Sequence, residues 1–72
     1  MVTIYVLRSL SSEIYYIGIS NDVSRRLEEH NRGKSKYTKG HMPWKIVYTE
    51  EVSDYPSARK REKYLKSTAG KN

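Results

Sequence analysis

The sequence contains no cysteine among its 72 residues. Disulfide bonds, thiolate metal sites and sulfur redox chemistry are therefore excluded. No apolar run approaches the roughly 18 residues that a membrane-spanning helix requires. The start of the chain also lacks the basic flank and the long apolar stretch of a signal peptide, since it reads MVTIYVL. These absences predict a soluble, cytoplasmic protein without a membrane partner.

The chain is also too short for more than one domain, which we place at residues 1–72. A chain of this length buries only about 60% of its unfolded surface, so its core is small. Such a core leaves no room for a deep enclosed pocket.

Acidic residues are scarce, because 8 Asp and Glu stand against 14 Lys and Arg, and the formal net charge is +6. Much of the excess falls between positions 25 and 45, and consists of Arg25, Arg26, Arg32, Lys34, Lys36, Lys39 and Lys45. Such clustering is typical of a surface that binds nucleic-acid phosphates. A merely solubilising basic surface is the alternative. Membrane-surface binding would need an amphipathic helix with bulky apolar residues, and none stands out.

The first half of the chain predicts a β-hairpin followed by a helix. Residues 2–7 and 14–19 are rich in β-branched and aromatic residues, and a short polar turn separates them. Tyr5 and Tyr16 should therefore lie on adjacent antiparallel strands. The following Ser-Asn-Asp offers helix N-cap chemistry, which predicts a helix over residues 22–31.

The second half predicts a loop, a strand and a helix. Residues 31–43 contain glycine and lysine without apolar periodicity, which indicates an exposed basic loop that could act as a lid or a backbone clamp. Residues 44–52 alternate with period 2 and predict a third strand. Its large apolar side chains should share one face: Trp44, Ile46 and Tyr48. Asp54 and Pro56 then mark the start of a second helix, which continues to about residue 66.

Polar residues interrupt the apolar stripes of both predicted helices. In the first helix Val23 and Leu27 form an i, i+4 apolar pair, yet Arg26 and His30 fall on the same side. In the second helix Glu62 falls on the stripe that Ala58 and Leu65 define. A buried charge costs several kcal/mol unless it is paired or coordinated, so these groups require partners.

Two interpretations of these inward-facing groups stay open. Arg26 and Glu62 could form a simple structural ion pair. Alternatively they could converge with Tyr5, Tyr16 and His30 into an active site on the sheet face. That set of groups suits phosphodiester cleavage: a carboxylate can hold a divalent metal, an arginine can neutralise charge on phosphate oxygens, and a tyrosine or histidine can move protons.

Several of these residues also have ordinary structural roles open to them. His30 could be a surface cation stabilised by the helix dipole. Gly18 inside a strand commonly marks a bulge or a close backbone approach. Tyr37, Trp44 and Tyr48 could stack on bases, although Trp44 and Tyr48 would share a face and fit the core.

The order and spacing of these motifs resemble the GIY-YIG nucleases. Thr3-Ile4-Tyr5 stands where that family has its first motif, and Tyr16-Ile17-Gly18 matches the second. The resemblance continues through RRLEEHN at residues 25–31 and ARKREKYLK at residues 58–66. It covers nearly the whole chain.

The resemblance implies an α/β (α+β) fold with a three-stranded antiparallel sheet flanked by two or more helices, in the order β-β-α-β-α. It also implies cleavage of nucleic acid with one divalent metal, Mg²⁺ or Mn²⁺. By position, Glu62 would be the metal ligand and Arg26 the phosphate-stabilising cation. Tyr5, more than Tyr16, would accept a proton from the attacking water, and His30 would orient a tyrosine or the phosphate. Because a tyrosine has an ordinary pKa of about 10, the metal or Arg26 would have to lower it.

The sequence departs from the family pattern at two positions. Thr3 replaces the first glycine, and Ile19 stands where the excision-repair branch has a lysine. Some members also use an asparagine beyond the glutamate helix, for which Asn72 is the candidate by position.

The predicted function is a metal-dependent endonuclease acting on DNA with little or only structure-based specificity, in DNA repair or recombination. RNA is an alternative substrate, and the chain should act as a monomer or a weak dimer. The exposed phosphate contacts should come from Arg25, Arg32, Lys34, Lys36, Lys39 and Lys45. The rival hypothesis is a nucleic-acid-binding module with this fold but without useful catalysis.

Overall fold

The computed structural model describes residues 1–34 and 36–69. The elements in chain order are β1 (Val2–Ser9), β2 (Tyr15–Ser20), α1 (Val23–Asn31), α2 (Lys36–Lys39), β3 (Trp44–Val52) and α3 (Tyr55–Ala69). The predicted order β-β-α-β-α is confirmed, with the one-turn helix α2 added between α1 and β3. Within the described ranges, no helix is long and apolar enough to cross a membrane.

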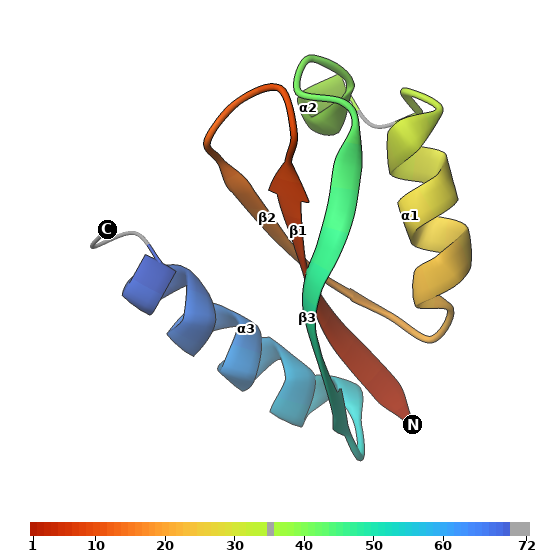
Figure 1. The fold of residues 1–72 in the computed structure, drawn as a ribbon. Coiled ribbons are helices and arrows are strands. Elements are labelled where there is room, and N and C mark those ends of the chain that lie inside the picture. The colour runs from red at the N-terminus through yellow and green to blue at the C-terminus, as the bar shows by residue number, and fades with distance from the viewer. Residues whose placement is uncertain (35, 70–72) are drawn as a thin grey trace.

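The three strands form one antiparallel sheet in the order β2-β1-β3, so β1 is central (Figure 1). The β1–β2 register pairs Tyr5 with Gly18 and Leu7 with Tyr16. Because side chains alternate along a strand, Tyr5, Leu7 and Tyr16 all project from the same face. The hairpin thereby brings the two motif tyrosines together, as predicted.

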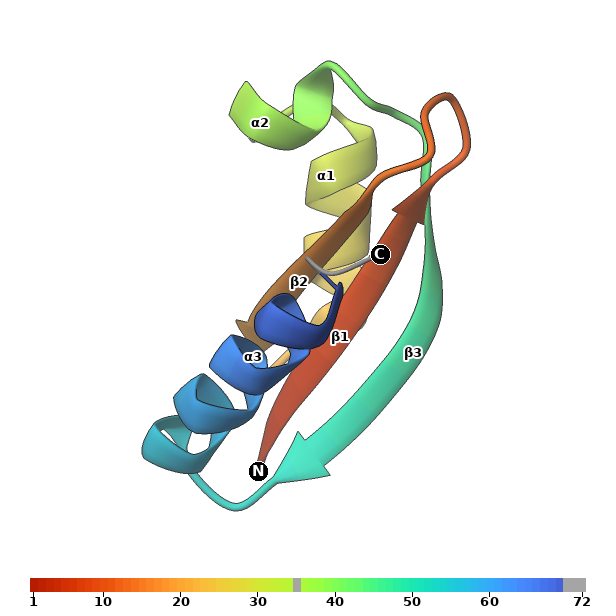
Figure 2. The same ribbon diagram turned by 90° about the vertical axis from the view of Figure 1, so that its left-hand side faces the viewer.

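Helices α1 and α3 cover opposite faces of this sheet (Figure 2). The face under α3 carries a core that includes Ile4 and Ala58. The face under α1 carries a second core around Tyr5, against which Val23 and Leu27 of α1 pack. The alternation of β1 therefore sends neighbouring side chains into two separate cores, and the predicted apolar stripe of each helix is buried in one of them.

Both long helices begin at an aspartate, as the sequence predicts. Asp22 accepts a hydrogen bond from the backbone N–H of Arg25 at 3.1 Å. Asp54 accepts one from the backbone N–H of Ser57 at 2.9 Å. Each carboxylate satisfies a backbone donor that the first helical turn leaves without a partner.

A β-bulge reverses the side-chain alternation of β3. The register pairs Leu7 with Ile46 but Val6 with Tyr48, so Val47 is an extra residue in β3. Tyr48 therefore projects from the α3 side of the sheet, opposite to Ile46, and is 43% exposed. The predicted common face is correct for Trp44 and Ile46 but wrong for Tyr48, because one inserted residue exchanges the two faces for everything beyond it.

The segment predicted as an exposed basic loop is anchored in the interior. Thr38 of α2 is fully buried, and its backbone carbonyl accepts a hydrogen bond from Trp44 Nε1 at 2.9 Å. Its Oγ1 lies 2.9 Å from His30 Nδ1. A single buried residue in a one-turn helix produces no apolar periodicity, so the sequence pattern missed both the helix and its anchor.

Candidate active site

Tyr5, Tyr16 and His30 form an aromatic cluster between the sheet and α1. Tyr5 and His30 are each 1% exposed, and the Tyr5 hydroxyl lies 3.2 Å from His30 Nε2. The ring centroids of Tyr16 and His30 are 4.8 Å apart, and those of the two tyrosines are 6.3 Å apart. His30 is thus a buried partner of the tyrosines rather than a surface cation at the end of its helix.

Arg26 joins this cluster from α1, one turn before His30. Its guanidinium interacts electrostatically with the Tyr5 phenol, and its Nη1 donates to Glu29 Oε1 at 2.7 Å. Glu62 pairs instead with Lys66, its Oε2 lying 3.2 Å from Nζ. The ion pair that would join Arg26 to Glu62 is therefore replaced by two separate pairs, each within one helix.

Burial dominates the acid–base chemistry of Tyr5. Desolvation raises the pKa of its phenol, and the neighbouring Tyr16 and Glu29 raise it further. The hydrogen bond and the positive charge of Arg26 lower the pKa, but the net pKa lies above the ordinary value. Burial therefore raises the pKa of Tyr5 by more than Arg26 lowers it, contrary to the expectation from the sequence. Tyr5 holds its proton at neutral pH.

His30 is shifted in the opposite direction. Burial lowers the pKa of its imidazole, and the positive charge of Arg26 lowers it further, while Glu29 raises it. A histidine with a lowered pKa is neutral at neutral pH and keeps one bare ring nitrogen. In the tautomer whose bare nitrogen is Nε2, that nitrogen would be a proton acceptor beside the Tyr5 hydroxyl.

Glu62 lies on the other side of the sheet from this cluster. It belongs to α3, which packs against β2 and β1 from the face opposite to α1 (Figure 2). Its side chain is 22% exposed. The prediction that all five groups share one sheet face is therefore correct for Tyr5, Tyr16, Arg26 and His30 but wrong for Glu62. Asn72 lies outside the described residues.

The described residues contain no cluster of three or more His, Asp or Glu side chains that could enclose a metal. A closed structural zinc site is thus not built from them. Mg²⁺ differs, because it commonly keeps several waters and is held by one or two carboxylates together with substrate phosphates. A single partly exposed carboxylate such as Glu62 fits this second kind of binding.

Gly18 provides the space that the Tyr5 phenol occupies. A Cβ built on Gly18 would lie 2.5 Å from Tyr5 Cζ and 2.5 Å from its hydroxyl oxygen. Tyr5 is itself packed against His30, so it has little freedom to move aside. The glycine of the second motif therefore serves a close approach, one of the two roles that its place in a strand indicates.

Gly18→Ala should destabilise the protein by about 1–3 kcal/mol, the usual cost of overpacking a core, and displace the Tyr5 ring. Thermal unfolding measures the first effect, and the ring resonances of Tyr5 in NMR spectra measure the second. Gly40→Ala is the matched control, since a Cβ there would meet no atom within 4 Å. Equal melting temperatures for the two variants would contradict the close-contact role of Gly18.

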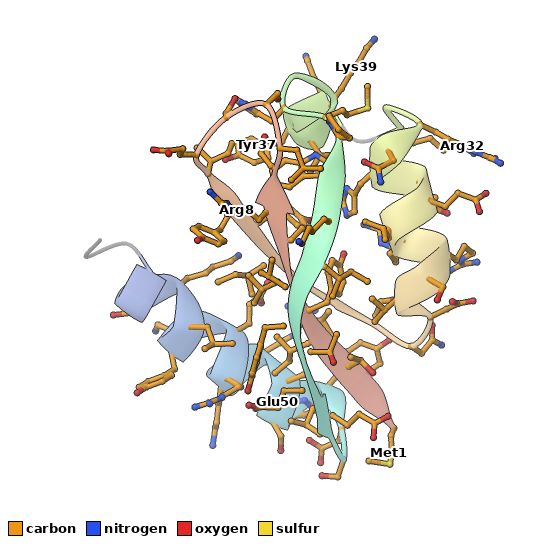
Figure 3. The ribbon with its side chains drawn as sticks, in the orientation of Figure 1. Met1, Arg8, Arg32, Tyr37, Lys39 and Glu50 are labelled. Carbon is orange, nitrogen blue, oxygen red and sulfur yellow. The ribbon has the colours of Figure 1, made fainter. Side chains whose placement is uncertain are left out.

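The predicted phosphate-contacting side chains are exposed: Arg25, Arg32, Lys34, Lys36, Lys39 and Lys45. In Figure 3, Lys39 and Arg32 lie at the end of the molecule that carries α2, and Glu50 lies toward the other end. Arg8 joins the basic end, because the register of the sheet places it opposite Lys45. Sequence reasoning missed Arg8, since it lies in the polar turn after the first predicted strand, far in sequence from the basic segment, and only strand pairing brings it to the basic cluster.

The family model described as the GIY-YIG catalytic domain matches residues 1–72. The chain belongs to the GIY-YIG family. Curated relatives of this GIY-YIG domain carry the name UPF0213 protein. One from Natronomonas pharaonis is 40% identical over 65 residues, which is 89% of this chain and 75% of the relative. One from Listeria innocua is 41% identical over 69 residues, covering 94% of this chain and 76% of the relative.

A third relative with that name, from Clostridium perfringens, is 38% identical over 64 residues, or 88% of this chain and 68% of its own length. No solved structure matches the chain. Membership in the GIY-YIG family indicates a nuclease domain and nucleic acid as its substrate class. The printed names of the relatives state no activity, so substrate, metal and biological role are argued from the site.

Proposed function

We propose that this GIY-YIG domain is a metal-dependent endonuclease that hydrolyses DNA phosphodiester bonds with Mg²⁺ or Mn²⁺. The observation that carries the proposal is the contact of Tyr5 with both His30 and Arg26. These are a proton donor, a neutral proton acceptor and a fixed positive charge within one buried cluster. Such a combination serves hydrolysis of a charged ester better than it serves binding alone.

Tyr5 acts as a relay rather than as a free phenolate. Because burial raises its pKa, the phenol does not lose its proton to solvent at neutral pH. As the attacking water loses a proton to the Tyr5 oxygen, the phenol proton passes to His30 Nε2. One P–O bond forms to the water oxygen. The P–O bond to the leaving strand breaks with its electron pair on the leaving oxygen, which takes a proton from solvent, and His30 ends as an imidazolium.

Arg26 stabilises the negative charge that grows on the phosphate oxygens. Its side chain is 36% exposed, so one edge of the guanidinium is open to a substrate while another is held by Glu29. Guanidinium groups match phosphate geometry through several N–H donors. The same charge favours the transfer of negative charge onto the Tyr5 oxygen during the relay.

Glu62 is the carboxylate that would hold the divalent cation. When bound, such an ion would act as a Lewis acid on the phosphate oxygens. Glu62 and the Tyr5 cluster approach β2 from opposite faces, and β2 is an edge strand of the sheet. A nucleic-acid strand that follows the β2 edge is therefore the substrate position that both groups can reach.

The exposed basic residues contact the phosphate backbone and supply affinity. Phosphate contacts carry no base information, and sequence readout needs an element that enters a groove. Among the described elements, α1 and α3 cover the sheet and α2 is a single turn, so no helix or ribbon is dedicated to this task. Specificity should accordingly be low or depend on DNA shape, with repair or recombination intermediates as candidate substrates.

Incubation of the purified chain with supercoiled, branched and single-stranded DNA, and with RNA alongside, tests this proposal. Cleavage products are expected with Mg²⁺ or Mn²⁺ and not with a chelator, because the single carboxylate needs a bound ion to act. Cleavage that is equally fast in chelator would contradict the metal requirement. If the chain retards the mobility of DNA but cleaves no substrate with either metal, the nuclease proposal is contradicted.

The separation of Glu62 from the tyrosine cluster favours a second candidate function. A chain whose carboxylate stays paired with Lys66 would bind nucleic acid through its basic residues without useful catalysis. The binding module predicts retardation of DNA in gel-shift assays and no products at any metal concentration. The same incubation therefore distinguishes the two functions.

A further inference from the structure

Three fully buried polar side chains form a continuous hydrogen-bonded row from β1 to α2. The Tyr5 hydroxyl lies 3.2 Å from His30 Nε2, and His30 Nδ1 lies 2.9 Å from Thr38 Oγ1. The exposed fractions of the three residues are 1%, 1% and 0%. Both ring nitrogens of His30 thus have a partner, and the partner on the side away from Tyr5 is Thr38.

The donors and acceptors of this row can be assigned in order. Burial raises the pKa of the Tyr5 phenol, so its hydroxyl carries a proton at neutral pH that it can donate. In the assignment that follows, the Tyr5 hydroxyl donates this proton to His30 Nε2, which is then the bare nitrogen of the ring. In a neutral imidazole the remaining proton is on Nδ1, and it is donated to Thr38 Oγ1.

We infer that Thr38 is a positioning residue that holds His30 in the Nδ1-protonated tautomer, with Nε2 free to accept the Tyr5 proton. This inference rests on the proposed nuclease function for its catalytic consequence, although the tautomer itself does not depend on it. Thr38 touches neither the reacting atoms nor the substrate. It acts through the hydrogen bond that orients the imidazole, as outer partners of functional histidines commonly do.

The hydroxyl of Thr38 can be removed without removing the anchor of α2. The backbone carbonyl of Thr38 accepts the hydrogen bond from Trp44 Nε1, and a side-chain substitution leaves that carbonyl in place. Valine has nearly the shape of threonine but no hydroxyl. Thr38→Val therefore removes the hydroxyl that contacts His30 and keeps the carbonyl that anchors α2, and Thr38→Ser restores a hydroxyl at the same position.

The ¹⁵N shifts of the His30 ring, measured by NMR on the full chain without metal or substrate, test the inference directly. The wild type and Thr38→Ser should show Nδ1 protonated and Nε2 bare, whereas Thr38→Val should shift the population toward the Nε2-protonated form. An unchanged spectrum in Thr38→Val, or Nε2 protonated in the wild type, would overturn the inference. Because no cleavage is needed, this result is independent of whether the nuclease proposal holds.

Steady-state cleavage supplies the second readout. Thr38→Val should lower kcat by about 10²-fold, the lower end of what a positioned proton acceptor contributes, with KM changed less than about twofold. Thr38→Ser should recover most of the loss. Ser53→Ala is the control, since it removes an exposed hydroxyl in the turn after β3 and should keep kcat. Unchanged Trp44 fluorescence shows that the anchor is intact. A Thr38→Ser variant as slow as Thr38→Val would overturn the inference.

Discussion

Arg26→Ala should lower kcat for DNA cleavage by about 10²–10³-fold, the usual loss when one preorganised charge donor is removed. Its effect on DNA binding should be no more than several-fold, since Arg26 contributes one phosphate contact among many. The difference arises because the negative charge on the phosphate oxygens is greatest in the transition state. Single-turnover cleavage and gel-shift titration measure the two quantities separately.

Arg25→Ala is the matched control for this prediction. Arg25 precedes Arg26 on α1 and also lies near Glu29, its Nε being 3.9 Å from Oε2, but its side chain is 64% exposed. The two substitutions remove the same charge from the same helix. Arg25→Ala should weaken binding to a similar degree and leave kcat within about twofold. Equal losses of turnover in both variants would make Arg26 a plain phosphate contact.

Glu62→Gln should reduce metal-dependent cleavage by about 10³-fold, because the several kcal/mol that a bound cation supplies to the transition state would be lost. The amide is nearly isosteric with the carboxylate, so the fold should persist. Raising the Mg²⁺ or Mn²⁺ concentration should recover part of the activity if the loss is one of metal affinity. Cleavage rates across a metal titration measure the effect.

Glu28→Gln controls for the loss of a helical carboxylate. Glu28 pairs with Arg32 four residues later, as Glu62 pairs with Lys66, but it lies on α1 and its side chain is 61% exposed. This substitution should leave cleavage unchanged. If Glu62→Gln cuts DNA as fast as Glu28→Gln does, Glu62 is not the metal ligand, and its place on α3 is structural.

The local parts of the fold follow from short-range chemistry that the sequence displays. The hairpin that puts Tyr5 and Tyr16 on adjacent strands, the helix start at Asp22 and the apolar stripe of Val23 and Leu27 all depend on residues close together in the chain. Such features were predictable because strand alternation, helix periodicity and capping act over a few residues. The same logic placed Arg26 and His30 on the inward side of α1.

The sequence pattern was less informative wherever one residue or a long-range contact decides the outcome. The extra residue Val47 turned Tyr48 to the opposite face, and a bulge leaves no composition signal of its own. Thr38 is a polar residue in a lysine-rich segment, and only its position beneath His30 explains why it is buried.

By itself, the sequence determined the family, the order of the elements and which helix faces carry polar groups, because these depend on motif spacing and periodicity. Only the tertiary structure decided which of those polar groups meet. Arg26 and Glu62 both face inward, yet α1 and α3 lie on opposite sides of the sheet. The direction of the Tyr5 pKa was likewise set by packing, since burial outweighs the charge of Arg26. A sequence shows which side of a helix faces the core, whereas the chain's path through space decides which core that is.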